Sequence, residues 1–424
     1  MKSATKRAIP LLALLAFPAL GQSPDARPLR LREYLAEVER TNLDLAASRF
    51  NLPIAEAQVV LAKLLPDPQF TGGIDAYDLT DQGLPTSLVW GLSQTIELGG
   101  KRGARIAEAR AGVTLAQAQL ADFFETLRAS ATNAYIDALS ARQILDRKRR
   151  TLESVERLVA ATEQRLQAGD VSPTALWQVK VEAERFRADF VSAEGDVRAA
   201  DAALELYLGA PGAGQPPHVV PVGDLKIPAK AMKEEVLVAR AVETRSDVLV
   251  ALGAERTAQA QVGLARANRW IDPSVSASIT HNPSDAAAGI PAQKALGLTL
   301  SLPLPFSRLT HGELDAARAA AQQSETQVAS VRRRVAVEIR QALARYEATR
   351  NAVDVYAAGV LTNADRALEA TRYSYDRGAT RLLELLDAQR TVDDVYLGYA
   401  AALADHARAS VTLERAAAMW DVEF

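Results

Sequence analysis

The sequence predicts a mainly helical chain that carries four membrane-type β-strands and is built as two copies of one structural unit. Three observations support this fold class. Four segments of about ten residues alternate apolar with small polar residues, as tilted strands that cross a bilayer do. Two very long stretches contain no proline and are rich in alanine. The two halves of the chain also match one another at a spacing of about 205 residues.

Residues 1–21 have the features of a secretory signal. Lys2, Lys6 and Arg7 precede an apolar run over 9–20, and Ala19-Leu20-Gly21 has the small-x-small pattern that signal peptidase cuts. The run is too short to span a bilayer as a helix. Because the chain has no cysteine, we expect neither a lipid-anchored N-terminus nor disulfides. These features leave a periplasmic, a secreted or an outer-membrane β-barrel protein.

The internal repeat runs through most of the remaining sequence. Matched positions are Val59 with Val262, Pro68 with Pro273, Leu92-Ser93 with Leu300-Ser301, and Gly169 with Gly378. A repeat of this length is too long for a solenoid unit and indicates duplication of a half-domain. We therefore predict a first repeat over 22–210, a linker over 211–230 and a second repeat over 231–424.

The strands are predicted at about 68–78, 87–97, 273–281 and 294–303. One face of each is apolar, with residues such as Phe70, Trp90, Ile279 and Leu298, and the other is small and polar. A half-buried sheet of a soluble domain is the alternative, and the occurrence of two matched pairs argues against it.

Four strands cannot close a membrane barrel, and an open edge in lipid would leave backbone groups unpaired. Several chains must therefore share one barrel. The polar, Pro- and Gly-containing connections over 79–87 and 282–293 are predicted as loops at its outer mouth.

Long helices are predicted at about 102–168 and 311–377, because neither range contains proline. At 1.5 Å per residue each would be roughly 100 Å long, which exceeds any ordinary globular domain. Apolar residues recur in both at steps of three and four, which indicates a heptad seam between helices. The seam positions are Leu127, Ala131, Ala134, Ala138, Ala141 and Leu145 in the first helix, and Val335, Ile339, Ala342, Tyr346, Thr349, Val353, Tyr356 and Val360 in the second.

Each long helix is expected to end in a glycine turn and to return as a second helix, over about 173–208 and 380–418. Gly169 can take the left-handed C-cap conformation, Asp170 or Ser172 can cap the next helix, and its first turn accepts Pro173. Gly378 and Thr380 are expected to play the same parts in the second repeat. These turns are either plain caps or the distal tips of a conduit, where they would face the inner membrane.

Several stretches together resemble the outer-membrane factor family, the TolC-like outer-membrane efflux proteins. The resemblance covers about residues 30–420. Its main elements are the stretch from Leu92 to Arg102 (LSQTIELGGKR), Ala107 to Ala109, the tip from Arg165 to Ser172, Asp67-Pro68 and Asp272-Pro273, the stretch 303–306 (PLPF), and Tyr375, Arg377-Gly378 and 385–391 (LLDAQRT). The ELGGKR stretch is most similar to members of the cobalt-zinc-cadmium heavy-metal efflux type.

The resemblance implies a two-repeat outer-membrane efflux duct: a homotrimer with a 12-stranded β-barrel in outer-membrane lipid and a long α-helical barrel through the periplasm. It also implies docking on a periplasmic adaptor and an inner-membrane pump of the resistance-nodulation-division type, with passive conduction of substrates such as heavy-metal cations. The candidate docking residues at the tips are Arg165, Gly169, Val171, Ser172, Arg377, Gly378 and Thr380.

Glu384 and Asp387 are the candidate periplasmic gate. They lie three residues apart, on one helix face just beyond the second tip. In a trimer they would form rings of carboxylates that attract cations and hold a constriction. The alternative, which the sequence supports equally, is that both residues are ordinary solvated acids on the helix surface.

The sequence offers little support for an enzyme, a cofactor or a metal site. His218, His281, His311 and His406 are scattered, and without cysteine a structural zinc site is not expected. A formal net charge of −3 does not suggest a nucleic-acid partner.

Two other functions remain open at this point. The outer-membrane channel of a type I protein secretion system would share the fold. A periplasmic coiled-coil scaffold or adhesin would need the helices and not the strands.

Overall fold

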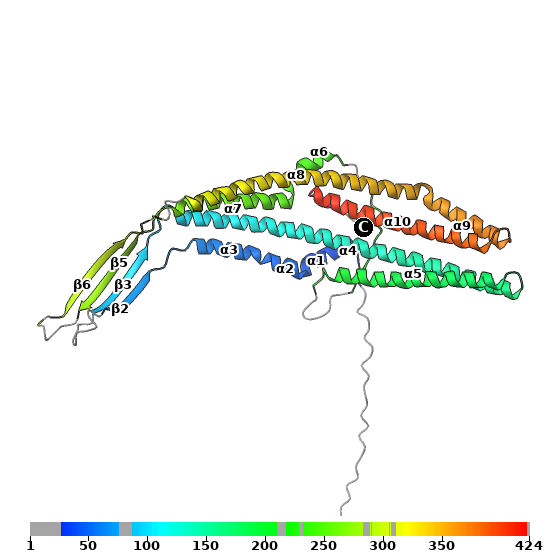
Figure 1. The fold of residues 1–424 in the computed structure, drawn as a ribbon, viewed down its shortest axis with the longest axis horizontal. Helices are drawn as coiled ribbons and strands as arrows, with labels where there is room; N and C mark the ends of the chain where they lie inside the picture. The colour runs from blue at the N-terminus through cyan, green and yellow to red at the C-terminus, as the bar shows by residue number, and fades with distance from the viewer. Residues whose placement is uncertain are drawn as a thin grey trace, which may run out of the picture.

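A computed structural model describes residues 27–75, 87–209, 218–228, 232–282, 289, 291–304, 306 and 311–421. The predicted signal over 1–21 and most of the two predicted outer loops lie outside these ranges. Figure 1 shows an elongated molecule with a β-sheet at one end and two helical hairpin turns at the other. No described helix combines the length and apolar character that crossing a membrane as a helix requires.

The two halves have parallel element orders. The first contains α1 (Leu31–Thr41), α2 (Leu43–Arg49), α3 (Asn51–Ala62), β2 (Gln69–Asp75), β3 (Ser87–Thr95), α4 (Lys101–Gln167) and α5 (Pro173–Glu205). The second contains α6 (Glu234–Thr244), α7 (Ser246–Asn268), β5 (Ser274–Asn282), β6 (Gln293–Ser301), α8 (Gly312–Val355), the π-helix η2 (Tyr356–Val360), α9 (Leu361–Asp376) and α10 (Leu382–Ala416). The helices that precede the strands in each half were not predicted from the sequence.

The four long strands form one antiparallel sheet in the order β2-β3-β5-β6. Strands β3 and β5 join the two halves, with Trp90 paired to Ile279 and Leu92 to Ala277. Because paired residues share a face, Phe70, Leu92, Ala277 and Leu298 form one row across the sheet. The sequence prediction of four strands with one apolar face is confirmed.

Helix α4 has 67 residues and runs from the sheet to the first tip (Figure 1). Three of its predicted seam positions are buried, namely Leu127, Ala131 and Ala138. In α8 the seam residues Val335, Ile339 and Tyr346 are buried against the end of α10. Alanine at the seam allows this close approach between helices.

The second long helix is not continuous as predicted, because a five-residue π-helix interrupts it at Tyr356–Val360. Tyr356 packs with Tyr399 of α10, at 6.0 Å between ring centroids. A Cβ at Gly398 would lie 2.5 Å from the Tyr356 hydroxyl oxygen. The wider π-turn and the absent side chain at 398 thus make room for the Tyr356 ring between α10 and the α8–α9 segment.

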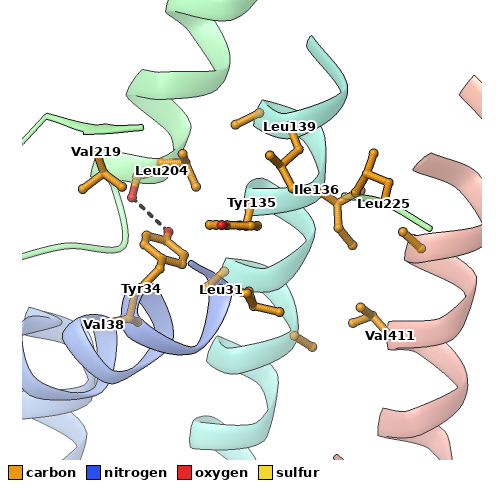
Figure 2. Packing of buried hydrophobic residues seen from close by; sticks show 14 of the residues in the cluster. Leu31, Tyr34, Val38, Tyr135, Ile136, Leu139, Leu204, Val219, Leu225 and Val411 are labelled. Carbon is orange, nitrogen blue, oxygen red and sulfur yellow. Dashed lines mark hydrogen bonds between the residues drawn. The ribbon is translucent and has the colours of Figure 1, made fainter. Parts of the chain in front are cut away.

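The largest core lies midway along the molecule, where α1 and the end of α5 pack on α4 (Figure 2). The Tyr34 hydroxyl donates to the Leu204 carbonyl oxygen at 3.1 Å, and burial raises the pKa of Tyr34. The Tyr135 hydroxyl lies 2.8 Å from the Leu29 carbonyl oxygen and accepts from the Val222 N–H at 3.0 Å. Burial raises the pKa of Tyr135 to about 12. Both phenols therefore stay neutral. Tyr34 ties α1 to the end of α5, and Tyr135 ties the segments at Leu29 and Val222 to α4.

The segment predicted as a linker over 211–230 contains a short strand, β4 (Val219–Pro221), which pairs in parallel with β1 (Arg27–Leu29). Three residues are too few for the alternation that identifies a strand in a sequence. This pairing joins the start of the first repeat to the segment that follows α5.

The ELGGKR stretch is the junction between the sheet and α4. Glu97 forms an ion pair with Arg105, and the Lys101 Nζ lies 2.5 Å from Asp272 Oδ2. The other oxygen of Asp272 accepts the Leu98 N–H at 3.1 Å. Lys101 is only 5% exposed, and Asp272 is the carboxylate that pairs with it there. The Lys101–Asp272 ion pair thus joins the two halves of the chain where the sheet meets the helices.

Candidate functional site

The first tip is built as the sequence predicts. Gly169 follows α4 with φ 84°, and the Asp170 N–H donates to the Arg165 carbonyl oxygen at 2.9 Å, which is the Schellman pattern. Ser172 is the N-cap of α5, and its Oγ accepts the Ala175 N–H at 3.4 Å. Glycine is required here because the left-handed backbone reverses the chain after α4.

The second tip has the same turn and a different cap. Gly378 has φ 73°, and the Ala379 N–H donates to the Ser374 carbonyl oxygen at 2.9 Å. Helix α10 begins at Leu382 with Arg381 at the N-cap and no side-chain capping bond. The expectation that Thr380 caps this helix is therefore wrong. Arg381 occupies the position of Ser172, and its side chain has no oxygen that could accept from the helix.

The two tips lie side by side and share a small core. The Arg165 guanidinium lies 5.1 Å from the centre of the Tyr375 ring, which joins the end of α4 to the end of α9. Val179 of α5 packs with Leu382, Leu385 and Leu386 of α10 and with Tyr375. On the other side of α9, Arg377 stacks on Tyr373 at 3.5 Å. The tip residues named from the sequence thus form one continuous end of the molecule.

An ion pair between a buried glutamate and a partly exposed arginine connects α5 to α10 just above the tips. Arg390 donates through Nε and Nη2 to the two carboxylate oxygens of Glu182, at 2.8 and 2.5 Å. Glu182 is 4% exposed, and the hydrogen bond from Arg390 holds its pKa below the ordinary value. No sequence pattern reveals this pair, because its members are 208 residues apart and each alone is an ordinary helical charge.

The candidate gate residues lie beside this pair. Asp387 accepts from Nη1 of Arg390 at 3.2 Å, and it remains exposed. Glu384 is exposed and forms no ion pair with any other described residue. The structure thus brings Asp387 together with the Glu182–Arg390 pair and leaves Glu384 free at the start of α10.

A second polar network ties α4 to α10 and α9. Asp393 is buried, accepts from the Thr151 hydroxyl at 2.6 Å and lies 3.3 Å from Arg147 Nε. Arg147 also stacks on the Tyr396 ring at 4.1 Å, and the Tyr396 hydroxyl donates to Asp365 at 2.8 Å. Burial, and secondly this bond, raise the pKa of Tyr396. The helices of the two tips are therefore held by charged and polar contacts as well as by apolar packing.

At the opposite end, the sheet exposes its apolar face. Exposed apolar side chains cover it from edge to edge: Phe70, Ile74, Trp90, Leu92, Ile279, Leu296, Leu298 and Leu300. The reverse face carries small polar residues, such as Ser276 paired with Thr299. A face of this kind is suited to lipid, and the reverse face to water.

The substitution Leu298→Arg tests which face meets lipid. Leu298 is 78% exposed near the middle of β6, so the arginine would lie at bilayer depth. We expect a loss of about 2 kcal/mol and less folded protein in the outer membrane. The measurement is the heat-modifiable fraction on gels of outer-membrane preparations. Thr299→Arg on the reverse face is the matched control, and equal loss in both variants would contradict the assignment.

No group of three or more His, Asp and Glu side chains in the described ranges is arranged to hold a metal ion. His218 instead contacts Glu205 at 3.1 Å, and His406 is buried on the Tyr346 ring.

A lipid-facing sheet at one end and paired helical tips at the other define a channel protein of the outer membrane that extends into the periplasm. The sequence model of the family "Outer membrane efflux protein" matches residues 35–210 and 237–418, and the chain belongs to this family. The family prediction is confirmed, and a purely periplasmic scaffold is excluded.

Curated relatives and solved structures are similar to this chain over most of its length. The chain is 25% identical to the cobalt-zinc-cadmium resistance protein CzcC of Cupriavidus metallidurans, over 92% of this chain and 90% of the relative. It is 24% identical to the cation efflux system protein CusC of Escherichia coli O157:H7, over 86% and 80%. A crystal structure of CusC superimposes with a TM-score of 0.74 at 21% identity, covering 94% and 95%. The Campylobacter jejuni outer-membrane channel CmeC superimposes with 0.72 at 16%, covering 97% and 94%.

Proposed function

We propose that this chain is the outer-membrane exit duct of a tripartite efflux system that expels heavy-metal cations. The observation that carries the cargo assignment is the similarity to CzcC, a cobalt-zinc-cadmium resistance protein, over 92% of this chain. In this proposal the duct conducts passively, and the energy and the choice of metal reside in the inner-membrane pump. The chain is not an enzyme.

The active form in this proposal is a homotrimer. Strands β2 and β6 are the edges of the described sheet, and an edge in lipid leaves backbone groups without partners. Pairing β6 of one chain with β2 of the next satisfies both edges and closes a barrel of twelve strands across three chains. The long helices then continue the wall of the passage into the periplasm.

The tips dock a periplasmic adaptor, which connects the duct to a pump of the resistance-nodulation-division type. The surface that supports docking is the exposed end formed by the turns at Gly169 and Gly378, with Arg165, Val171 and Ser172 on one turn and Arg377 and Thr380 on the other. Both turns are rigid because their backbone hydrogen bonds are satisfied internally.

The function is tested by deleting the gene from its native host and measuring growth in cobalt, zinc, cadmium, copper and silver salts. We expect lower tolerance to at least one of these metals, restored by the wild-type gene. Unchanged tolerance to all five, together with loss of a secreted protein, would contradict metal efflux and favour a secretion duct.

The gate proposal assigns the constriction to Glu384 and Asp387. Removing either carboxylate from a ring of three would widen the passage and lower its attraction for cations. We expect Glu384→Ala and Asp387→Ala to raise single-channel conductance in planar bilayers and to reduce cation preference. Glu347→Ala, an exposed acid on α8, is the control. Conductance and selectivity equal to wild type in both gate variants would contradict the assignment.

A further inference from the structure

A pocket of about 410 Å³ lies midway along the molecule, away from both the sheet and the tips. Helix α1, the middle of α4 and the last described residues enclose it, and these segments meet near the C-terminus in Figure 1. Its size is in the range of small-ligand sites. Its walls combine apolar side chains with the charged residues Arg32, Glu39, Arg128 and Asp421; the apolar part is formed by Leu31, Leu35, Val38, Phe124, Leu127 and Trp420. The proposed efflux function makes no use of this space.

One cationic side chain in the pocket lacks an acceptor. The Arg128 guanidinium lies 4.0 Å from the centre of the Trp420 ring and 5.6 Å from that of Phe124. Its Nε is buried and has no hydrogen-bond partner. Because aromatic rings lie against the guanidinium, the missing acceptor has to approach in its plane. A buried donor without a partner is unfavourable, and an incoming acceptor would relieve that cost.

The carboxylates nearest to Arg128 are engaged elsewhere. Glu125 accepts from the Ser246 hydroxyl at 2.8 Å, and Glu414 accepts the Asp421 N–H at 2.6 Å. Glu39, which also lines the pocket, is exposed. Arg128 forms no ion pair with any residue that the structure describes. Among the described residues, none supplies an acceptor for Nε.

We propose that this pocket binds the C-terminal carboxylate of an apolar peptide segment. A carboxylate fits the Nε and Nη donors of one arginine as a bidentate pair, and the leucine and aromatic walls fit an apolar side chain next to it. The nearby acids Glu39, Glu125 and Glu414 repel any anion, and they repel a doubly charged phosphate or a second carboxylate more strongly than the single carboxylate that Arg128 neutralises. The site gives the duct a second attachment point in the periplasm, and this inference does not depend on the metal cargo.

The test uses the full chain, purified as its assembly in detergent, and the probe acetyl-Ala-Leu with a free carboxylate. Isothermal titration calorimetry is expected to show saturable binding at least tenfold tighter than for the C-terminal amide of the same peptide. Acetyl-Ala-Asp is expected to bind at least tenfold more weakly. No binding of the carboxylate probe, or equal binding of the amide, would overturn the proposal.

Two variants act on different parts of the site. Arg128→Lys keeps the positive charge and removes the planar pair of donors, while Leu35→Trp fills the pocket and leaves Arg128 unchanged. Each is expected to weaken binding at least tenfold, and the exposed control Arg332→Lys is expected to bind as wild type does. Unchanged binding in both variants would overturn the proposal. Binding that occurs only when the chain is shortened after Asp421 would also overturn it, because the chain's own end would then be the occupant.

Discussion

Gly99→Ala is expected to destabilise the junction between sheet and helix by about 2–5 kcal/mol. Gly99 has φ 71°, where a residue with a Cβ is strained. Its added Cβ would lie 2.4 Å from Cγ and Cδ1 of Trp270 and 2.5 Å from the Trp270 Cβ. Rotation of the indole does not relieve a contact with Cβ, so the backbone that leads into β5 has to move. The readouts are the thermal unfolding midpoint in detergent and the amount of protein in the outer membrane.

A substitution at the adjacent glycine separates the cost of the left-handed backbone from the cost of the contact with Trp270. Gly100 has φ 72°, and nothing lies within 4 Å of a Cβ built on it. Gly100→Ala should therefore show the backbone cost alone, about 1–2 kcal/mol. If the two variants lose the same stability, the contact with Trp270 is not the cause.

Arg390→Ala is expected to loosen the distal end by about 2 kcal/mol, because it removes the bidentate partner of the buried Glu182 carboxylate. Local opening of α5 and α10, measured by hydrogen exchange of tip amides, reports this loss more directly than global unfolding does. The control is Arg185→Ala, because Arg185 lies 3.9 Å from Glu182 and its side chain is 63% exposed. An ion pair whose arginine is this exposed contributes little to stability.

The pH dependence of this variant has a defined sign. In the native chain the pKa of Glu182 is below its ordinary value of 4.5, so the pair stabilises above that pH and is lost as pH falls through the lower folded pKa. In Arg390→Ala burial favours the protonated acid, so the deficit is largest at neutral pH and shrinks on acidification. Adding Glu182→Gln should recover part of the loss. A deficit that is constant between pH 4 and 7 would contradict the ion-pair explanation.

The four long strands and the long helices could be predicted because each has a strong local signal, whereas the helices that precede the strands were missed. Alternation identified the strands with Phe70 and Leu298, and the steps of three and four identified the seam through Leu127 and Ile339. Helix α1 also carries such a signal, since its buried residues Leu31, Tyr34 and Val38 follow helical spacing. Helix α3 does not, because its apolar residues, such as Ile54, Val60 and Leu61, are spread around the helix and form no stripe on one face.

The sequence by itself determined the duplication, the alternating strands, the glycine turns at 169 and 378, and the family. The strands show in short-range periodicity, and the turns show in single glycines with special backbone freedom. The duplication and the family show in matching stretches of sequence. None of these signals requires knowledge of which residues meet in space. Only the tertiary structure decided which distant residues meet: Glu182 with Arg390, Lys101 with Asp272, and Arg128 with Trp420. It also placed the π-turn at Tyr356 opposite Gly398. Contacts of this kind depend on how whole helices pack. The sequence does not reveal them, because the apolar periodicity of a helix is the same whichever helix it packs against.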